Sequence, residues 1–175
     1  MPVSLRQLRT EPIDMWLAIL RKTCRFARSV QERAMVDEVA PPLRYFKAGD
    51  PVHVRAQQVW LILVSKVMSS PRNPQRPTVM TYGDLAETMG MDRRAGITLN
   101  RQLGVVGDIC VANDLPALNC IVINDRLNAP GDHVVTRPGR TWQQEQADAM
   151  STNWFTVRVP TTGTLRKIRS AAVAE

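Results

Sequence analysis

The segment from Thr81 to Arg94 constrains the fold of this chain more than any other stretch. Its sequence is Thr-Tyr-Gly-Asp-Leu-Ala-Glu-Thr-Met-Gly-Met-Asp-Arg-Arg. Thr81 and Asp92 stand where helix N-caps are expected, and Gly90 suits the left-handed turn that ends a helix. The pattern predicts a short helix, a tight turn and a second helix that begins at Arg93. These elements in this order are typical of a helix-turn-helix, whose second helix enters the major groove of DNA.

Positive charge is concentrated in three parts of the chain. Of the 175 residues, 44% are hydrophobic and 22% are charged, as in a globular protein, and the net charge is +7 with a pI of about 10.0. Basic residues exceed acidic ones by four in residues 1–35 and by three in both 57–104 and 151–175, whereas residues 105–150 are acidic. This balance favours a polyanionic partner, most often nucleic acid. A solvated basic surface without a partner is the alternative.

The predicted architecture is mainly α with a small β wing: a winged helix-turn-helix core plus an N-terminal helical arm. Within the core, Val54–Ser69 is expected to form a helix with an apolar stripe, and the helix from Arg93 is expected to run to about Ala112. Glycines within that second helix weaken the prediction and would allow another segment to approach closely. Three regions are expected: a helical arm over residues 1–53, a winged helix-turn-helix domain over 54–140, and a C-terminal helix-strand element with a basic tail over 141–175.

The N-terminal arm contains an amphipathic pattern over residues 13–39. Its apolar stripe includes Trp16, Leu17 and Leu20, and its other face is rich in arginine. The stripe predicts burial, either against residues 54–140 or against a second copy of the chain, which makes it a candidate homodimer element. Packing within the chain is favoured. The basic face is interpreted as solvated, with contact to phosphates as the alternative.

The remaining segments complete the wing and the C-terminal element. Leu118–Ile123 is predicted to be a buried strand, with His133–Val135 as the return strand of the wing. A threonine-capped helix over Trp142–Met150 and a strand over Trp154–Val159 are expected next, with both tryptophans as core anchors. The end, Thr161–Glu175, is polar and basic and is expected to be mobile.

The sequence contains no recognisable catalytic or metal-binding pattern. Cys24, Cys110 and Cys120 are widely spaced and flanked by apolar residues, which predicts buried free thiols in a reducing compartment. The two histidines are isolated, and the aspartates of residues 105–150 match no nuclease pattern. We therefore expect no cofactor and no metal. Because no apolar run reaches transmembrane length and no cleavage signal is evident, the chain is expected to be cytoplasmic.

Three motifs occur in the order found in one known family. Gln58–Trp60 is Q-V-W, Thr78–Gly90 is similar to T-V-S-Y-G-D/E-L-A-x-x-x-G, and Asn100–Gly104 is similar to G-R-A-L-G. With them the chain resembles the C-terminal DNA-binding domain of alkylguanine-DNA alkyltransferases and of their non-enzymatic alkyltransferase-like relatives. The likeness covers roughly 75 of the 175 residues. It implies a winged-helix scaffold that binds DNA.

The chain departs from this family at the reactive centre. Leu115-Pro116 and then Cys120–Gly131 fall where the family has L-P and then P-C-H-R-V-V-G-x-x-G. Aligning the strand valines puts Asn119 at the nucleophile position and Cys120 at the histidine position. A reactive thiolate needs a basic or positive neighbour, which Cys120 lacks in sequence. The resemblance therefore implies the scaffold without alkyl transfer.

Two further positions matter for the resemblance. Tyr82 falls on the family's tyrosine, which presses on the backbone of the flipped nucleotide; half-buried packing of this tyrosine on Trp60 is the alternative. The family's arginine that props the duplex open falls near Gly96 or Ile97 here, so that feature is not retained.

The sequence thus predicts a non-enzymatic protein that binds double-stranded DNA with the helix from Arg93. A protein-binding adaptor or inhibitor from a mobile element, built on the same scaffold, is the main alternative, and a nuclease or base-modifying enzyme is a third. Salt dependence separates the first two, since phosphate contacts weaken steeply with salt. The residues expected to contact nucleic acid are Tyr82, Arg93, Arg94, Thr98 and Arg101, with Arg72 and Arg76 of the proline-rich loop.

Overall fold

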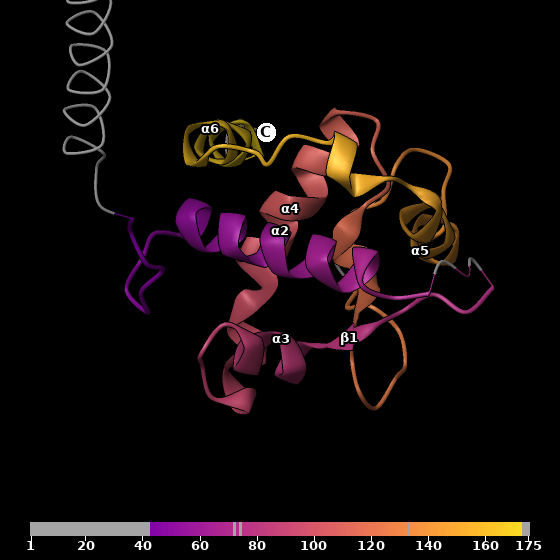
Figure 1. Ribbon diagram of the computed structural model, residues 1–175, viewed down its shortest axis with the longest axis horizontal. Helices are drawn as coiled ribbons and strands as arrows, with labels where there is room; N and C mark the ends of the chain where they lie inside the picture. Colours follow the sequence, from indigo (N-terminus) through magenta and orange to yellow (C-terminus); the bar gives the residue numbers. More distant parts are fainter. Residues whose placement is uncertain (1–42, 72, 74, 133, 173–175) are drawn as a thin grey trace, which may run out of the picture. The chain divides into compact units, whose positions relative to one another are not determined.

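A computed structural model of the chain describes residues 43–71, 73, 75–132 and 134–172, with the side chains of the last helix given as far as Ile168. Most of the described chain belongs to one compact unit, Phe46–Glu175. This unit is mainly helical and contains one sheet of two strands (Figure 1). The helix predicted from the amphipathic pattern over residues 13–39, which includes Cys24, lies outside the described residues.

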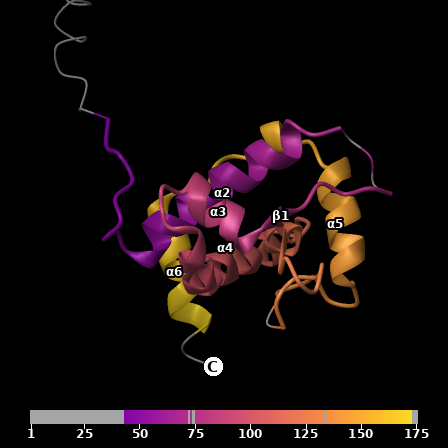
Figure 2. The same cartoon turned by 90° about the horizontal axis from the view of Figure 1, so that it is seen from below.

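Helix α2 (Val52–Met68) forms the centre of the unit. Val59, Trp60, Leu63 and Val67 from its predicted apolar stripe are buried, which confirms the helix, while Val64 is partly exposed. In Figure 1, α2 crosses the unit with α6 above it and α3 below. Seen at right angles, α5 and α6 stand at opposite ends of the unit (Figure 2).

Helix α3 (Tyr82–Thr88) follows the short strand β1 (Met80–Thr81) and begins as the sequence predicts. The Thr81 hydroxyl accepts from the Asp84 amide, and the Asp84 carboxylate accepts from the Thr81 amide, which makes a reciprocal capping box. Gly90 adopts a left-handed conformation with φ of 74°, so the predicted turn is confirmed.

The helix predicted from Arg93 to Ala112 is divided in two. Asp92 caps its start as expected, but the first part, η1 (Arg93–Leu99), is a 3-10 helix, and the α-helix α4 (Asn100–Ala112) begins only afterwards. The reason lies in close packing on α3. A Cβ on Gly96 would lie 2.6 Å from the carbonyl oxygen of Tyr82, so the first turn of α3 rests directly on this glycine. The expectation that a glycine here permits close approach is confirmed.

The predicted wing is not formed by the described residues. Leu118–Ile121 is a 3-10 helix, η2, and only Val122–Ile123 is a strand, β2. Strand β2 pairs in parallel with β1, with Met80 opposite Val122, rather than with a return strand. Val134 and Val135 lie in no strand, and His133 lies outside the described residues. The largely apolar sequence of residues 118–123 arises because the segment is buried on all sides. Hydrophobic periodicity alone cannot distinguish such a buried segment from a strand.

The C-terminal region packs on the same core as the rest of the unit. Helix α5 (Trp142–Ser151) is capped by Thr141 as predicted. The strand predicted over Trp154–Val159 is wrong, because Trp154–Thr156 forms a 3-10 helix, η3. The Trp154 indole donates to the Ala149 carbonyl at 2.9 Å and packs edge to face against the indole of Trp60. These contacts hold Trp154 in the core. Trp154 is thus the core anchor expected.

The expectation of a mobile C-terminal tail is also wrong for the residues up to Ala172. Residues Thr162–Ala172 form helix α6, which packs on α2 and α4. Its Leu165 is completely buried, and Ile168 packs on the core. A short polar and basic segment can be ordered by one apolar face, which the sequence prediction overlooked.

Candidate nucleic-acid interface

One exposed face of the unit is built from η1 and the first turn of α4. Arg94, Ile97, Thr98 and Arg101 are exposed on it. Arg94 donates its backbone N–H to the Asp92 carboxylate at 2.8 Å, so the cap holds the backbone while the guanidinium remains outside. Neither the Arg94 nor the Arg101 side chain forms an ion pair within the described part of the chain.

Arg93 is held differently from Arg94. Its guanidinium donates to Asp84 at 2.6 Å and to Glu87 at 3.2 Å, both on α3. Interaction with the Thr81 side chain and then with Arg93 lowers the pKa of Asp84, and the hydrogen bond to Asp84 raises the pKa of Arg93. The Arg93 side chain lies against Gly83, where a Cβ would come within 2.6 Å of its Cγ. Arg93 therefore fixes the turn between α3 and η1.

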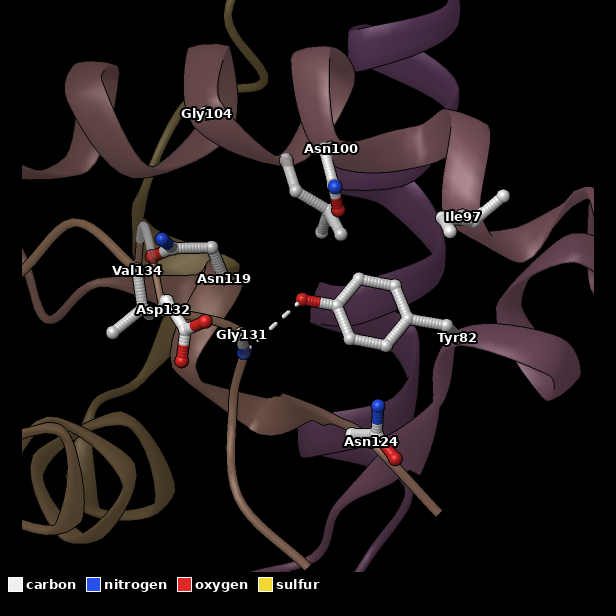
Figure 3. Close-up of a pocket in the computed structure, with 10 residues that line it drawn as sticks. Tyr82, Ile97, Asn100, Gly104, Asn119, Asn124, Gly131, Asp132 and Val134 are labelled. Carbon is white, nitrogen blue, oxygen red and sulfur yellow. Dashed lines mark hydrogen bonds between the residues drawn. The ribbon is translucent and has the colours of Figure 1, made fainter. Parts of the chain in front are cut away.

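A pocket of about 370 Å³ opens beside this face and contains the Tyr82 side chain. The Tyr82 hydroxyl accepts from the Gly131 N–H at 3.3 Å and lies 3.0 Å from where a Cβ of Gly131 would stand, so a larger residue there would require the tyrosine to shift. In Figure 3 the ring lies between the Asn100 and Asn124 side chains. The other lining residues are Ile97, Leu103, Gly104, Asn119, Asp132 and Val134.

Asn119 is the most deeply buried polar side chain of the pocket. It is only 5% exposed, and its amide lies against α4, where a Cβ on Gly107 would come within 2.8 Å of it. Apart from a long contact of 4.0 Å with the Cys120 sulfur, the amide makes no hydrogen bond to another described residue. Such a group can bind water or a polar group of a ligand, which makes this carboxamide a candidate contact in the pocket.

The backbone that carries Asn119 is held from behind by α5. The completely buried Glu145 accepts from the Ala117 N–H at 2.7 Å and from Arg137 at 3.0 Å, and Gln146 donates to the Cys120 carbonyl at 2.7 Å. Arg137 also pairs with Asp148 at 2.5 Å. We refer to Arg137, Arg140, Glu145 and Asp148 as the buried ion-pair network, after its completely buried member Glu145; the other three side chains are partly exposed.

The two described cysteines are poor nucleophiles. Burial raises the pKa of both Cys110 and Cys120 to about 12. The Cys120 thiol donates to the Val135 carbonyl at 3.6 Å, and both cysteines are free and buried, as predicted. Among the described residues, no group of histidine, cysteine or carboxylate side chains is arranged to hold a metal ion. In the same part of the chain, no helix combines the length and apolar character needed to cross a membrane.

The structure brings together some of the predicted contact residues and not others. Tyr82 lies in the pocket, beside the face that carries Arg94, Thr98 and Arg101. Arg76 is exposed in the loop before β1 and does not line the pocket, and Arg72 lies outside the described residues. Sequence reasoning missed the carboxamides of the pocket, Asn100, Asn119 and Asn124, together with Asp132.

Comparison with known proteins adds no relative. No protein-family model matches the chain, and neither a curated protein nor a solved structure matches it.

Proposed function

We propose that this protein binds double-stranded DNA without catalysing a reaction, using the face formed by η1 and the start of α4. The observation that carries the proposal is the contrast on this face between Arg93, which is paired with α3, and Arg94 and Arg101, which have no partner carboxylate among the described residues. Guanidinium groups that project from a helical segment can donate hydrogen bonds to phosphate oxygens and to the major-groove edge of guanine.

The chemistry of the neighbouring side chains supports the same interface. Thr98 and Asn100 are exposed between the two arginines and carry hydrogen-bonding groups suited to base edges or phosphates. Ile97 is 76% exposed and can contact a thymine methyl group or a sugar. The segment therefore carries groups for phosphate contacts, which position a protein on DNA, and groups for base contacts. Both are expected of an element that enters the major groove.

The Tyr82 pocket extends this proposal to a base that has left the double helix. Its volume of about 370 Å³ lies in the range of small-molecule sites, and an aromatic ring with several carboxamides suits a planar base with a hydrogen-bonding edge. The resemblance to alkyltransferase-like proteins supports this use of Tyr82. The unreactive thiols support binding without alkyl transfer, because the thiolate is the nucleophile.

The affinity of the full chain for random duplex DNA, measured against salt concentration, tests the proposal. Each lost phosphate contact reduces the salt slope by about one, so Arg94→Ala/Arg101→Ala is expected to reduce it by about two. The matched control is Lys66→Ala/Arg158→Ala, which removes the same charge elsewhere in the unit. Equal losses in both variants, or no loss in the first, would place DNA binding elsewhere.

The pocket has a separate test. Gly104 lines the pocket, and a Cβ there meets no atom within 4 Å, so Gly104→Leu is expected to fill the pocket without disturbing the fold. A duplex with 2-aminopurine opposite a mismatch becomes more fluorescent when that base leaves the stack. The parent protein is expected to raise the signal, and Gly104→Leu is expected to keep the salt slope but lose the signal. An unchanged signal would separate the pocket from DNA binding.

A further inference from the structure

A second concave surface lies between the C-terminal half of α2 and residues 154–159. It is an apolar groove of about 440 Å³ that shares no lining residue with the Tyr82 pocket. Its exposed side chains include Phe155 at 79%, Val159 at 47% and Leu61 at 41%. Its apolar lining includes Leu61, Val64 and Met68 of α2 with Phe155, Val157 and Val159. Neighbouring exposed apolar residues of this kind mark interaction surfaces.

The two walls of the groove are fixed to each other. Trp60 and Trp154 meet edge to face, with ring centroids 5.7 Å apart, at the bottom of the groove. At one end, Gln57 on α2 donates to the Pro160 carbonyl at 2.9 Å. In Figure 1 the yellow segment that follows α5 runs along the upper side of α2, away from α3 and β1. The groove is therefore a formed feature that needs no rearrangement to accept a partner.

The charges around the groove determine the kind of partner it suits. Neither α2 (Val52–Met68) nor residues 151–172 contain an aspartate or glutamate, and their charged residues other than histidine are all lysine or arginine. Neither cation lines the groove itself, but exposed Arg158 stands between the lining residues Val157 and Val159, and partly exposed Lys66 follows the lining residue Ser65. An apolar surface formed by two segments that carry only cations favours a ligand that is apolar on one side and anionic at its edges.

We propose that this groove binds an amphipathic helix of a partner protein, with apolar side chains filling the groove and carboxylates facing Lys66 and Arg158. A helix supplies anchors at three- and four-residue spacing that suit an elongated groove. A second copy of this chain is a poorer occupant, because it would bring the same cations together. A flat anionic membrane cannot fill a concave surface whose bottom is formed by Trp60 and Trp154.

The test uses the full chain and two synthetic helical peptides. Both carry leucine at i, i+3, i+4 and i+7; one has glutamate at the flanking positions, and the other has lysine. The glutamate peptide is expected to bind at least tenfold more tightly by fluorescence anisotropy. Phe155→Ser and Leu61→Glu are each expected to weaken it tenfold or more. Leu127→Ser, which changes an exposed apolar residue that lines neither concave surface, is expected to leave its binding unchanged.

Four results would overturn the proposal. These are equal binding of the two peptides, no effect of Phe155→Ser on binding, complete displacement of the glutamate peptide by duplex DNA, or tighter binding to phosphatidylserine vesicles that depends on Phe155. Sedimentation adds one more: a dimer that Phe155→Ser dissociates would assign the groove to a second copy. A monomer that binds the glutamate peptide and DNA at the same time supports the proposal, since the two surfaces are separate.

Discussion

Arg137 and Arg140 contrast with Arg94 and Arg101 in how the fold uses their charge. The first pair belongs to the buried ion-pair network, with Glu145 completely buried. The second pair is exposed, and neither side chain has a partner carboxylate among the described residues. The count of 23 lysine and arginine residues therefore overstates the number of cations that are available to a ligand. Under the proposed function, the arginines that bind DNA are those that the fold leaves without a carboxylate partner.

The largest effect is expected from removing the centre of the buried network. Glu145→Ala leaves the Ala117 N–H and the backbone N–H and Nε of Arg137 without their acceptor, while Arg137 keeps Asp148, and breaking a buried pair costs about 3–5 kcal/mol. Glu87→Ala, which removes an exposed partner of Arg93, is expected to cost far less, because exposed ion pairs contribute little to stability. Urea unfolding of both variants measures the difference. Similar losses in the two would mean that burial does not distinguish these ion pairs.

The next effect concerns the position of Asn119 against α4. Gly107→Ala would place a Cβ 2.8 Å from the Asn119 amide, and such overpacking costs about 1–3 kcal/mol. Gly104→Ala is the matched control on the same helix, because its Cβ meets no atom within 4 Å, and it is expected to stabilise the protein by up to about 1 kcal/mol. Thermal unfolding compares the two. Opposite signs support the described packing, and a stabilising Gly107→Ala would contradict it.

A smaller effect is expected on the rate of thiol alkylation. With pKa values of about 12, Cys110 and Cys120 hold almost no thiolate at pH 8. Iodoacetamide is expected to modify neither in the folded chain and both in urea, as read from peptide masses. O6-methylguanine DNA is likewise expected to add no mass to Cys120. Modification of Cys120 under native conditions would show an activated thiol.

The smallest effect is the pH dependence contributed by Asp84. Its pKa is lowered in the folded protein, so its ionised form stabilises the fold above the unfolded pKa, and this contribution is lost as the pH falls below about 4. Asp84→Asn is therefore expected to be less stable than the parent at pH 7 and to approach it at low pH. A difference that grows as the pH falls would contradict the sign of this shift.

Local chemistry explains which parts of the fold the sequence predicts. The caps at Thr81, Asp92 and Thr141 and the turn at Gly90 depend on residues within four positions, and all four are found. The strand predicted over Leu118–Ile123 is confirmed only at Val122–Ile123, and its partner β1 lies about forty residues earlier in the chain, beyond the reach of any local pattern. Helix α6 was missed because burial of Leu165 against α2 and α4 orders it.

The candidate site divides in the same way. The exposed face depends on the Asp92 cap and on the arginines that come after it in the sequence. The sequence alone therefore predicts that Arg94 and Arg101 lie on this face. The pairing of Arg93 with Asp84 and Glu87 depends on the path of the turn, and the pocket brings Tyr82 together with Asn119 and Gly131 from distant positions. No local pattern contains that information.

Single substitutions of two adjacent arginines test the central claim most directly. Arg93→Ala and Arg94→Ala remove the same charge one residue apart, but of the two only Arg93 forms an ion pair with another described residue. The slope of log affinity for duplex DNA against log salt is expected to fall by about one for Arg94→Ala and to stay near the parent value for Arg93→Ala. Equal slopes in the two variants, whether both reduced or both unchanged, would contradict the account.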